Sequence, residues 1–324
     1  MKVAVTDYTF ADLFIEESIL GAEGHQIVAW KEKRPAAELA GLVADADAVL
    51  VQFAAADASV IAAMTRARVI VRYGIGVDNV DLDAARDRGI PVCNVPDYCV
   101  DEVADHTLAF ILATARQVVP HCVKLRGGGW GLATPLDQLR ALRDLTIGVV
   151  GFGRIGREVV ARLKPFKPRI LVHDPFATPG GLHAAGVEPA DLPILLAASD
   201  VVTLHCPSSA ATRGLINRES LALMRPSAVL INLARGDLVV SDALTDALRD
   251  GKLAGAALDV FAPEPIPPGH PILVMANVVL APHIASASVP AVRKLRETVA
   301  RIAASALRGD PLPNVVNGVG RRDV

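Results

Sequence analysis

The turn Gly151-Phe152-Gly153-Arg154-Ile155-Gly156 lies near the middle of the 324-residue chain. It follows an apolar run, 145–150, and leads into 157–163, whose apolar residues have helical spacing. In a dinucleotide-binding turn, one glycine allows the tight bend, one the close approach of a pyrophosphate and one the packing of helix on strand. Asp174 follows a second apolar run, 18 residues after the last glycine (174 − 156 = 18), where a ribose-binding carboxylate is expected. A turn aspartate before Pro175 is the alternative.

Composition limits the kinds of ligand. The net charge is −2 and the pI about 6.4, so the chain lacks the basic field that nucleic acid or an anionic membrane would attract. Its four cysteines form no CxxC pair, which favours a reducing, cytoplasmic compartment and argues against a structural metal. No apolar stretch reaches membrane-spanning length and no signal-peptide core is present. We therefore expect a cytoplasmic enzyme with a small-molecule ligand and no metal.

Short apolar runs alternate with helical or polar stretches through most of the chain, which is typical of βαβ units. The pattern predicts an α/β protein with two Rossmann-like, doubly wound parallel-sheet domains and a cleft between them. Residues 101–118 have the spacing of a long connecting helix, and residues 289–307 that of an amphipathic C-terminal helix. We predict a substrate domain, flavodoxin-like, from 1–100 plus 290–324, and an NAD-binding Rossmann domain from 101–289. The five strands expected in the first series and the six in the second lie near 3–5, 26–30, 48–51, 69–72, 91–95, 145–150, 169–173, 200–205, 228–233, 255–260 and 277–281.

Polar residues follow the later strands of the second series, at the sheet edge where parallel sheets bind ligands. They include a cation, Arg235, a carboxylate, Glu264, and an imidazole, His283. Hydride transfer to a keto acid needs a proton donor near neutral pH, which histidine supplies, and a carboxylate beside it favours its charged form. Arginine binds a carboxylate with two parallel hydrogen bonds. The set predicts chemistry on a 2-hydroxy or 2-keto acid.

Each of these residues also has a less specific interpretation. Arg235 fits an ordinary surface arginine, Glu264 a loop residue between two prolines, and His283 a buried, hydrogen-bonded histidine. Asp259 fits a structural role or a contact with the nicotinamide carboxamide equally well. In the first domain, residues 73–76 follow a strand and contain two glycines, so their backbone N–H groups are candidates to bind a carboxylate, or form a plain strand-to-helix turn.

At these residues the chain resembles the D-isomer-specific 2-hydroxyacid dehydrogenases, a family that includes phosphoglycerate dehydrogenases and the C-terminal binding protein corepressors. The resemblance covers nearly the whole length. It rests on motifs in the family's order, namely RYGIGVDNVDL (72–82), NVP with EVADHTL (94–108), GFGRIG (151–156), INLARGDLV (231–239), LDVFAPEP (258–265) and APHIA (281–285).

The resemblance implies roles for individual residues. It implies Arg235, Glu264 and His283 as catalytic residues, His283 being the acid/base. It also implies NAD rather than NADP as cofactor, since Asp174 is followed by no arginine for a 2′-phosphate, and a homodimer joined through the cofactor domains. The implied substrate contacts are Tyr73, Gly74, Ile75, Gly76, Arg235 and His283. The implied cofactor contacts are Gly151, Gly153, Arg154, Ile155, Gly156, Asp174, His205, Cys206, Pro207, Thr212, Leu233, Ala234, Arg235, Asp259 and His283.

Three functions fit these residues. The first is an NAD-dependent D-2-hydroxyacid dehydrogenase that reduces a small 2-keto acid such as glyoxylate or hydroxypyruvate. The second is a corepressor-like, NADH-sensing interaction protein, and the third a 3-phosphoglycerate dehydrogenase without a regulatory domain. The loop 52–57 offers no cation for a phosphate, which disfavours phosphorylated substrates.

Overall fold

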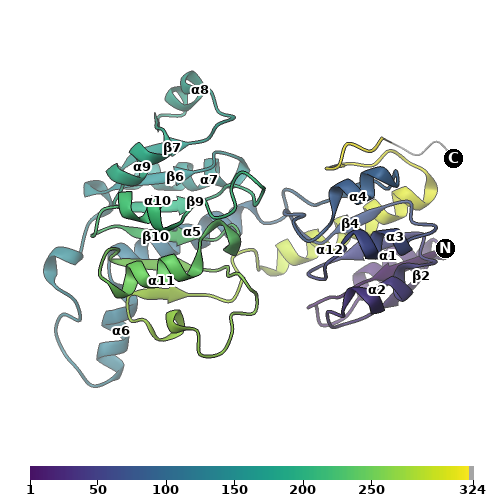
Figure 1. Ribbon diagram of the computed structural model, residues 1–324, viewed down its shortest axis with the longest axis horizontal. Coiled ribbons are helices and arrows are strands. Elements are labelled where there is room, and N and C mark those ends of the chain that lie inside the picture. The colour runs from purple at the N-terminus through teal and green to yellow at the C-terminus, as the bar shows by residue number, and fades with distance from the viewer. Residues whose placement is uncertain (321–324) are drawn as a thin grey trace. The chain divides into compact units, whose positions relative to one another are not determined.

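The computed structural model describes residues 1–320, and this part of the chain divides into two compact units (Figure 1). One unit consists of Met1–Tyr98 and the C-terminal segment from Ser288, and the other of Cys99–Ala287. Each is an α/β domain built on one parallel sheet, as the alternating pattern predicts. The C-terminal segment thus belongs with the N-terminal unit.

The first unit has five parallel strands in the order β2-β1-β3-β4-β5, the flavodoxin-like order. All four residues of β3 are buried, because helices cover both faces of the sheet, and apolar β-branched residues suit such strands. The strands are β1 (Lys2–Val5), β2 (Gln26–Ala29), β3 (Ala48–Val51), β4 (Ile70–Arg72) and β5 (Val92–Cys93).

Two hydrophobic cores fill the two sides of this sheet. On one side α1 (Phe14–Ala22) packs with α12 (Val289–Arg308), and α12 buries Val299 and Ala303 in the same core as Val3 and Val5. α12 begins after Ser288, whose side chain accepts a hydrogen bond from the Ala291 N–H. It ends before Gly309, which has a left-handed φ of 80°. The other core lies under α2 (Ala36–Val43), α3 (Ala58–Ala63) and α4 (Leu82–Asp87).

The second unit has seven parallel strands in the order β12-β11-β10-β9-β6-β7-β8. Six of them match the expected runs. The seventh, β8, lies at the edge; it has only two residues, a glutamate and a proline, and so gives no hydrophobic signal. The strands are β6 (Thr146–Val150), β7 (Arg169–His173), β8 (Glu188–Pro189), β9 (Val201–Leu204), β10 (Val229–Asn232), β11 (Gly255–Leu258) and β12 (Val278–Leu280).

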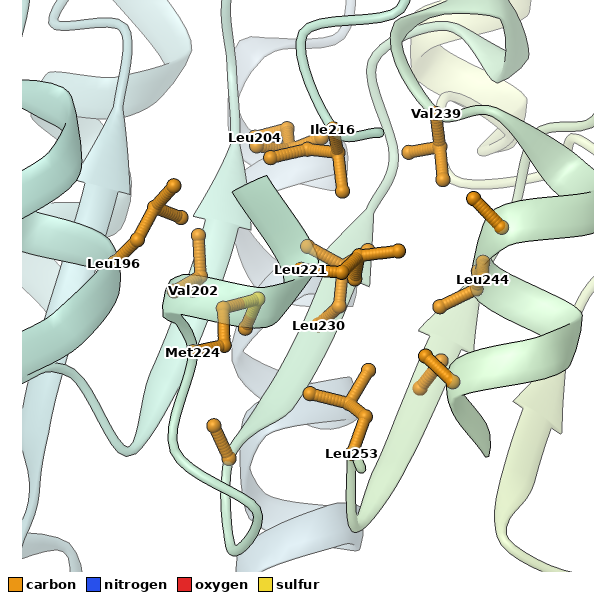
Figure 2. Packing of buried hydrophobic residues seen from close by; sticks show 14 of the residues in the cluster. Leu196, Val202, Leu204, Ile216, Leu221, Met224, Leu230, Val239, Leu244 and Leu253 are labelled. Carbon is orange, nitrogen blue, oxygen red and sulfur yellow. The ribbon is translucent and has the colours of Figure 1, made fainter. Parts of the chain in front are cut away.

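Helices cover both faces of this sheet as well. Behind the strands in Figure 1 lies α5 (Val100–Ala115), which packs on α7 (Arg154–Leu163), and in front lie α9 (Leu192–Ala198), α10 (Arg218–Leu223) and α11 (Ser241–Arg249). Figure 2 shows side chains of β9 and β10 against those of α10 and α11, including Leu230, Leu221 and Leu244. Burying one such leucine fully contributes about 2 kcal/mol to stability. The remaining elements are α6 (Val118–Arg126), α8 (Pro179–Ala184) and the 3-10 turns η1 (Leu136–Gln138), η2 (Leu142–Asp144), η3 (Lys164–Phe166), η4 (Gly236–Leu238) and η5 (Pro271–Val274).

One helix ends earlier than its pattern predicts. The helix expected over 101–118 stops at Ala115, because Gln117 adopts a left-handed conformation with φ of 53°, and α6 begins after it at an angle of 65°. Within residues 1–320, no single helix has the length and apolar character needed to cross a membrane; α5 and α6 meet that criterion only when they are counted together across this bend.

Candidate functional site

The polar residues predicted from the strand ends lie at one edge of the seven-stranded sheet. All seven strands are parallel, so their carboxyl ends share this edge, and the chain reverses its direction of winding between β6 and β9. Such a reversal is where open α/β sheets bind ligands. The glycine turn follows β6, and His205 follows β9, its neighbour in the sheet.

The three glycines of the turn meet different surroundings. Gly151 has φ of 99°, and a Cβ atom on it would lie 2.6 Å from the carbonyl carbon of His205. A Cβ on Gly156 would lie 2.1 Å from the Gly151 oxygen, so both positions are closely packed against backbone. A Cβ on Gly153 would meet nothing within 4 Å, and Gly153 directly precedes the first turn of α7. The backbone is therefore open in front of a helix N-terminus, as a pyrophosphate requires.

Asp174 is joined to this turn. One carboxylate oxygen accepts a hydrogen bond from the Phe152 N–H at 2.6 Å, and the other accepts one from the Phe176 N–H at 2.8 Å. Each carboxylate oxygen has two lone pairs, so both can accept a further hydrogen bond from ribose hydroxyls. The turn-aspartate interpretation and the ribose-binding interpretation are thus compatible.

The loop after β9 carries His205, Cys206 and Pro207. Burial lowers the pKa of His205 to about 4, so its ring is neutral at neutral pH, and the ring lies 2.9 Å from the Thr203 hydroxyl. Burial also raises the pKa of Cys206 to about 11, which keeps the thiol protonated. The Thr212 hydroxyl donates to the Pro207 carbonyl at 2.6 Å. These groups suit a lining for a cofactor better than proton transfer.

The imidazole and the carboxylate predicted to act together are in contact. His283 Nδ1 lies 2.8 Å from Glu264 Oε2, and Glu264 Oε1 accepts from the Phe261 N–H at 2.8 Å. Burial disfavours the charged carboxylate, but the hydrogen bond and charge of His283, the Phe261 N–H and the Arg235 guanidinium outweigh it and lower the pKa of Glu264. An ionised Glu264 fixes the ring of His283 with Nε2 directed away from it.

Asp259 holds the loop that carries His283. Its side chain is fully buried, and its two oxygens accept from the Ile284 and Ala285 N–H groups, each at 2.8 Å. Its carbonyl accepts from the N–H of His283 at 2.7 Å, and His283 itself has a left-handed φ of 54°. Of the two interpretations of Asp259, this geometry favours the structural one, because the carboxylate holds the loop that presents His283.

Arg235 is held by the turn that follows β10. The buried Asn232 side chain donates to the Arg235 carbonyl at 2.8 Å and accepts from the Ala234 N–H at 3.0 Å. A Cβ on Gly236 would lie 2.0 Å from the Phe261 carbonyl carbon, so only glycine lets this turn approach the Glu264 loop. The preceding Leu233 is 7% exposed, which places its side chain in the core.

In the first unit, residues 73–76 differ in part from the prediction. The Tyr73 side chain is buried and its hydroxyl donates to Glu16 at 3.1 Å, so it points into the core and not toward a ligand. The Tyr73 N–H donates to the Val51 carbonyl and the Gly74 N–H to the Arg72 carbonyl, and neither is available for a carboxylate. Within residues 1–320, the N–H groups of Ile75 and Gly76 donate to no protein acceptor. Those two groups are the remaining candidates.

The structure adds two cations that the sequence analysis did not single out. Arg72 ends β4 and is only 8% exposed, and its guanidinium lies 6.0 Å from the Phe53 ring centroid. Lys33 Nζ lies 5.6 Å from the same ring. The loop 52–57 itself carries no cation, as predicted, but Arg72 and Lys33 from neighbouring segments lie beside its Phe53 ring. The position of Arg72 at the end of a strand, directly before the glycine motif, was the signal in the sequence that could have identified this cation.

The described part of the chain, residues 1–320, contains no group of three or more His, Cys, Asp or Glu side chains placed to hold a metal ion. Within these residues Cys93, Cys99, Cys122 and Cys206 form no disulfide bond.

Comparison with known proteins relates this geometry to a family. Residues 108–285 match the model of the NAD binding domain of D-isomer specific 2-hydroxyacid dehydrogenases. The chain is 36% identical to D-3-phosphoglycerate dehydrogenase of Mycobacterium leprae over 305 residues, which are 94% of this chain but only 57% of the relative. It is 40% identical to glyoxylate reductase of Thermofilum pendens over 298 residues, 90% of this chain and 87% of that protein.

A solved structure extends the comparison. The crystal structure of an NADPH-dependent glyoxylate/hydroxypyruvate reductase from Sinorhizobium meliloti, in complex with NADP and malonate, is similar with a TM-score of 0.87 and 30% identity. The match covers 100% of this chain and 99% of that one. A relative solved with NADP therefore shares this fold.

Proposed function

This chain belongs to the D-isomer specific 2-hydroxyacid dehydrogenase family, and we propose that it is an NAD-dependent oxidoreductase that interconverts a small 2-keto acid and its D-2-hydroxy acid. The observation that carries the proposal is the 2.8 Å contact between His283 Nδ1 and Glu264 Oε2, beside Arg235, at the edge that holds the glycine turn. The D configuration comes from the family and not from a residue of this chain.

The proposed chemistry divides among three side chains. A bound nicotinamide supplies or accepts the hydride. Arg235 binds the carboxylate of the acid and polarises its carbonyl oxygen, and His283 gives its Nε2 proton to that oxygen during reduction or takes the hydroxyl proton during oxidation. Glu264 holds the ring orientation through its 2.8 Å contact with Nδ1, so that Nε2 is the nitrogen left to exchange the proton.

The accessible backbone at Gly153 and the Asp174 carboxylate, which is hydrogen-bonded to the glycine turn, fit a dinucleotide. We propose that NAD is the preferred dinucleotide. The ribose hydroxyls of NAD can donate to Asp174, whereas the 2′-phosphate of NADP would bring a second negative charge to the same carboxylate. The following residues, Pro175 and Phe176, supply no compensating cation.

Two substrate classes have support. The similarity to glyoxylate reductases over nearly the whole of both chains favours a small acid such as glyoxylate or hydroxypyruvate. Arg72 and Lys33 beside Phe53 favour instead an acid with a second anionic group, such as a phosphate, because two cations there attract more negative charge than one carboxylate carries.

We also propose a homodimer formed through the cofactor unit. α6 buries none of its residues, and Val123 and Leu125 on it are 66% and 58% exposed. Trp130 and Leu136, which follow it, are 88% and 71% exposed. Apolar side chains exposed in series indicate a surface that another protein covers, and a second copy of the chain is the partner that the family favours.

The test is a panel of 2-keto acids, with glyoxylate, hydroxypyruvate and 3-phosphohydroxypyruvate, assayed with NADH and with NADPH. We expect turnover with at least one acid and faster turnover with NADH. His283→Ala should keep NADH affinity and lose most turnover, while His183→Ala, which changes an exposed histidine of the same unit, should resemble the wild type. Tight NADH binding without turnover on any acid would reject the enzyme and support an NADH-sensing interaction protein.

A further inference from the structure

The turn that carries Arg235 is held on two sides. On one side Gly236 packs against Phe261 and the loop that carries Glu264. On the other side the turn meets the loop that follows β9, and this second contact contains a side chain, Asp237, to which the proposed function assigns no role. The position of Arg235 therefore depends on both neighbours.

Asp237 makes a specific contact with the β9 loop. Its Oδ2 atom accepts a hydrogen bond from the Ser208 hydroxyl at 2.6 Å, and the Arg213 Nε atom lies 3.3 Å from the same oxygen. Ser208 directly follows Pro207, so the bond links the Arg235 turn to the loop proposed to line the cofactor. The ion pair with Arg213 is largely exposed and contributes little, whereas the short bond to Ser208 is half-buried.

Backbone hydrogen bonds align the same two segments. The Gly214 N–H donates to the Asp237 carbonyl at 2.8 Å, and the Ile216 N–H donates to the Leu238 carbonyl at 2.9 Å. Ile216 and Val239 form a parallel bridge, and both side chains are buried in the core shown in Figure 2. The far end of the contact is thus fixed by burial, and at the end near Arg235 the Ser208–Asp237 side-chain bond adds to the backbone bond from Gly214.

We propose that Asp237 is a positioning residue: through Ser208 it ties the Arg235 turn to the cofactor loop and so sets the position of the Arg235 guanidinium. This inference rests on the proposed function, since it concerns binding of the acid by Arg235. Asp237 itself touches neither the acid nor the cofactor in this scheme. Its second oxygen, Oδ1, is buried and accepts no hydrogen bond within residues 1–320.

Three substitutions separate the hydrogen bond from the charge. Asp237→Ala and Ser208→Ala each remove the bond, while Asp237→Asn keeps an oxygen that can accept from Ser208 and loses only the charge. We expect Asp237→Ala to lower kcat/KM for the keto acid about tenfold, equivalent to about 1.4 kcal/mol, mainly through KM. Asp237→Asn should stay within about threefold of the wild type, and the double alanine variant should lose no more than either single one.

A binding measurement makes the test independent of turnover. Oxalate, a dianion that cannot be reduced by hydride, is titrated into the NADH complex of each variant, and NADH affinity is measured separately. We expect the oxalate Kd to rise about tenfold in Asp237→Ala and Ser208→Ala, with NADH affinity within threefold. Asp250→Ala, which changes an exposed aspartate of the same unit, should leave both unchanged.

The outcomes distinguish the two proposals. If the wild type reduces no keto acid and does not bind oxalate, the proposed function fails. If the wild type is active but Asp237→Ala behaves like Asp250→Ala, or if Asp237→Asn is as impaired as Asp237→Ala, the positioning role is wrong. If Asp237→Ala is too unstable to assay, Ser208→Ala decides alone, because unchanged oxalate binding in that variant overturns the inference.

Discussion

At the scale of single residues, the glycine turn shows how one residue type serves two purposes. The fold requires glycine at 151 and 156, since a Cβ on either would meet backbone atoms. At Gly153 a Cβ would meet nothing within 4 Å, so packing within the protein does not require a glycine there. We predict that Gly153→Ala folds with unchanged thermal stability and binds NADH about tenfold more weakly, because its methyl group occupies the space of a pyrophosphate. Gly180→Ala, at another glycine with nothing within 4 Å, is the control for fluorescence titration with NADH. Equal NADH affinity in the two variants would show that no phosphate approaches Gly153.

At the scale of elements, α6 lacks the burial that stabilises the other helices of its unit. A nine-residue helix that buries none of its residues is marginal in isolation. We predict that the double variant Val123→Asp and Leu125→Asp shifts the protein from dimer to monomer in sedimentation velocity, since charges on an apolar interface are costly to desolvate. Val274→Asp, at an equally apolar position that is 87% exposed on η5, should remain dimeric. A wild-type monomer would show that the proposed dimer does not form. A double variant that remains dimeric would show that the interface does not include α6.

At the scale of the whole molecule, the two units have separate hydrophobic cores, and only one of them carries the glycine turn. Glu16, in the other unit, is fully buried and bonds with both oxygens to Arg296 on α12, at 2.7 to 3.2 Å. Removing one partner of such a pair costs about 3–5 kcal/mol. We therefore predict that Glu16→Gln lowers the melting temperature of its own unit, so that calorimetry shows two transitions. NADH should raise the melting temperature of only the later transition, which belongs to the unit with the glycine turn.

The control for this experiment is Glu23→Gln, which breaks the partly exposed pair with Arg308 and should change stability by less than about 1 kcal/mol. A single transition in Glu16→Gln that moves as a whole with NADH would mean that the two units unfold together.

Much of the fold was predictable because parallel strands buried on both faces must be apolar along their whole length. Within residues 1–320, every strand of three or more residues coincides with an expected apolar run, and only β8, which consists of a glutamate and a proline, was missed. The ends of α5 were less predictable. The break at Gln117 depends on one left-handed residue inside a stretch that remains apolar, so periodicity gave no sign of it.

The residues of the proposed chemistry were predictable from the sequence, because a glycine turn follows one strand and an arginine, a glutamate and a histidine follow later strands of the same series. Strand order in a parallel sheet brings such residues to one edge whatever the details of packing. The supporting hydrogen bonds became visible only in the folded chain. Asp259 accepts from the His283 loop, Asp237 accepts from Ser208, and Tyr73 lies in the core and donates to Glu16. These partners lie between 25 and 57 residues apart along the chain. No local pattern specifies such pairs, because their hydrogen bonds form only after the sheets have brought distant loops together.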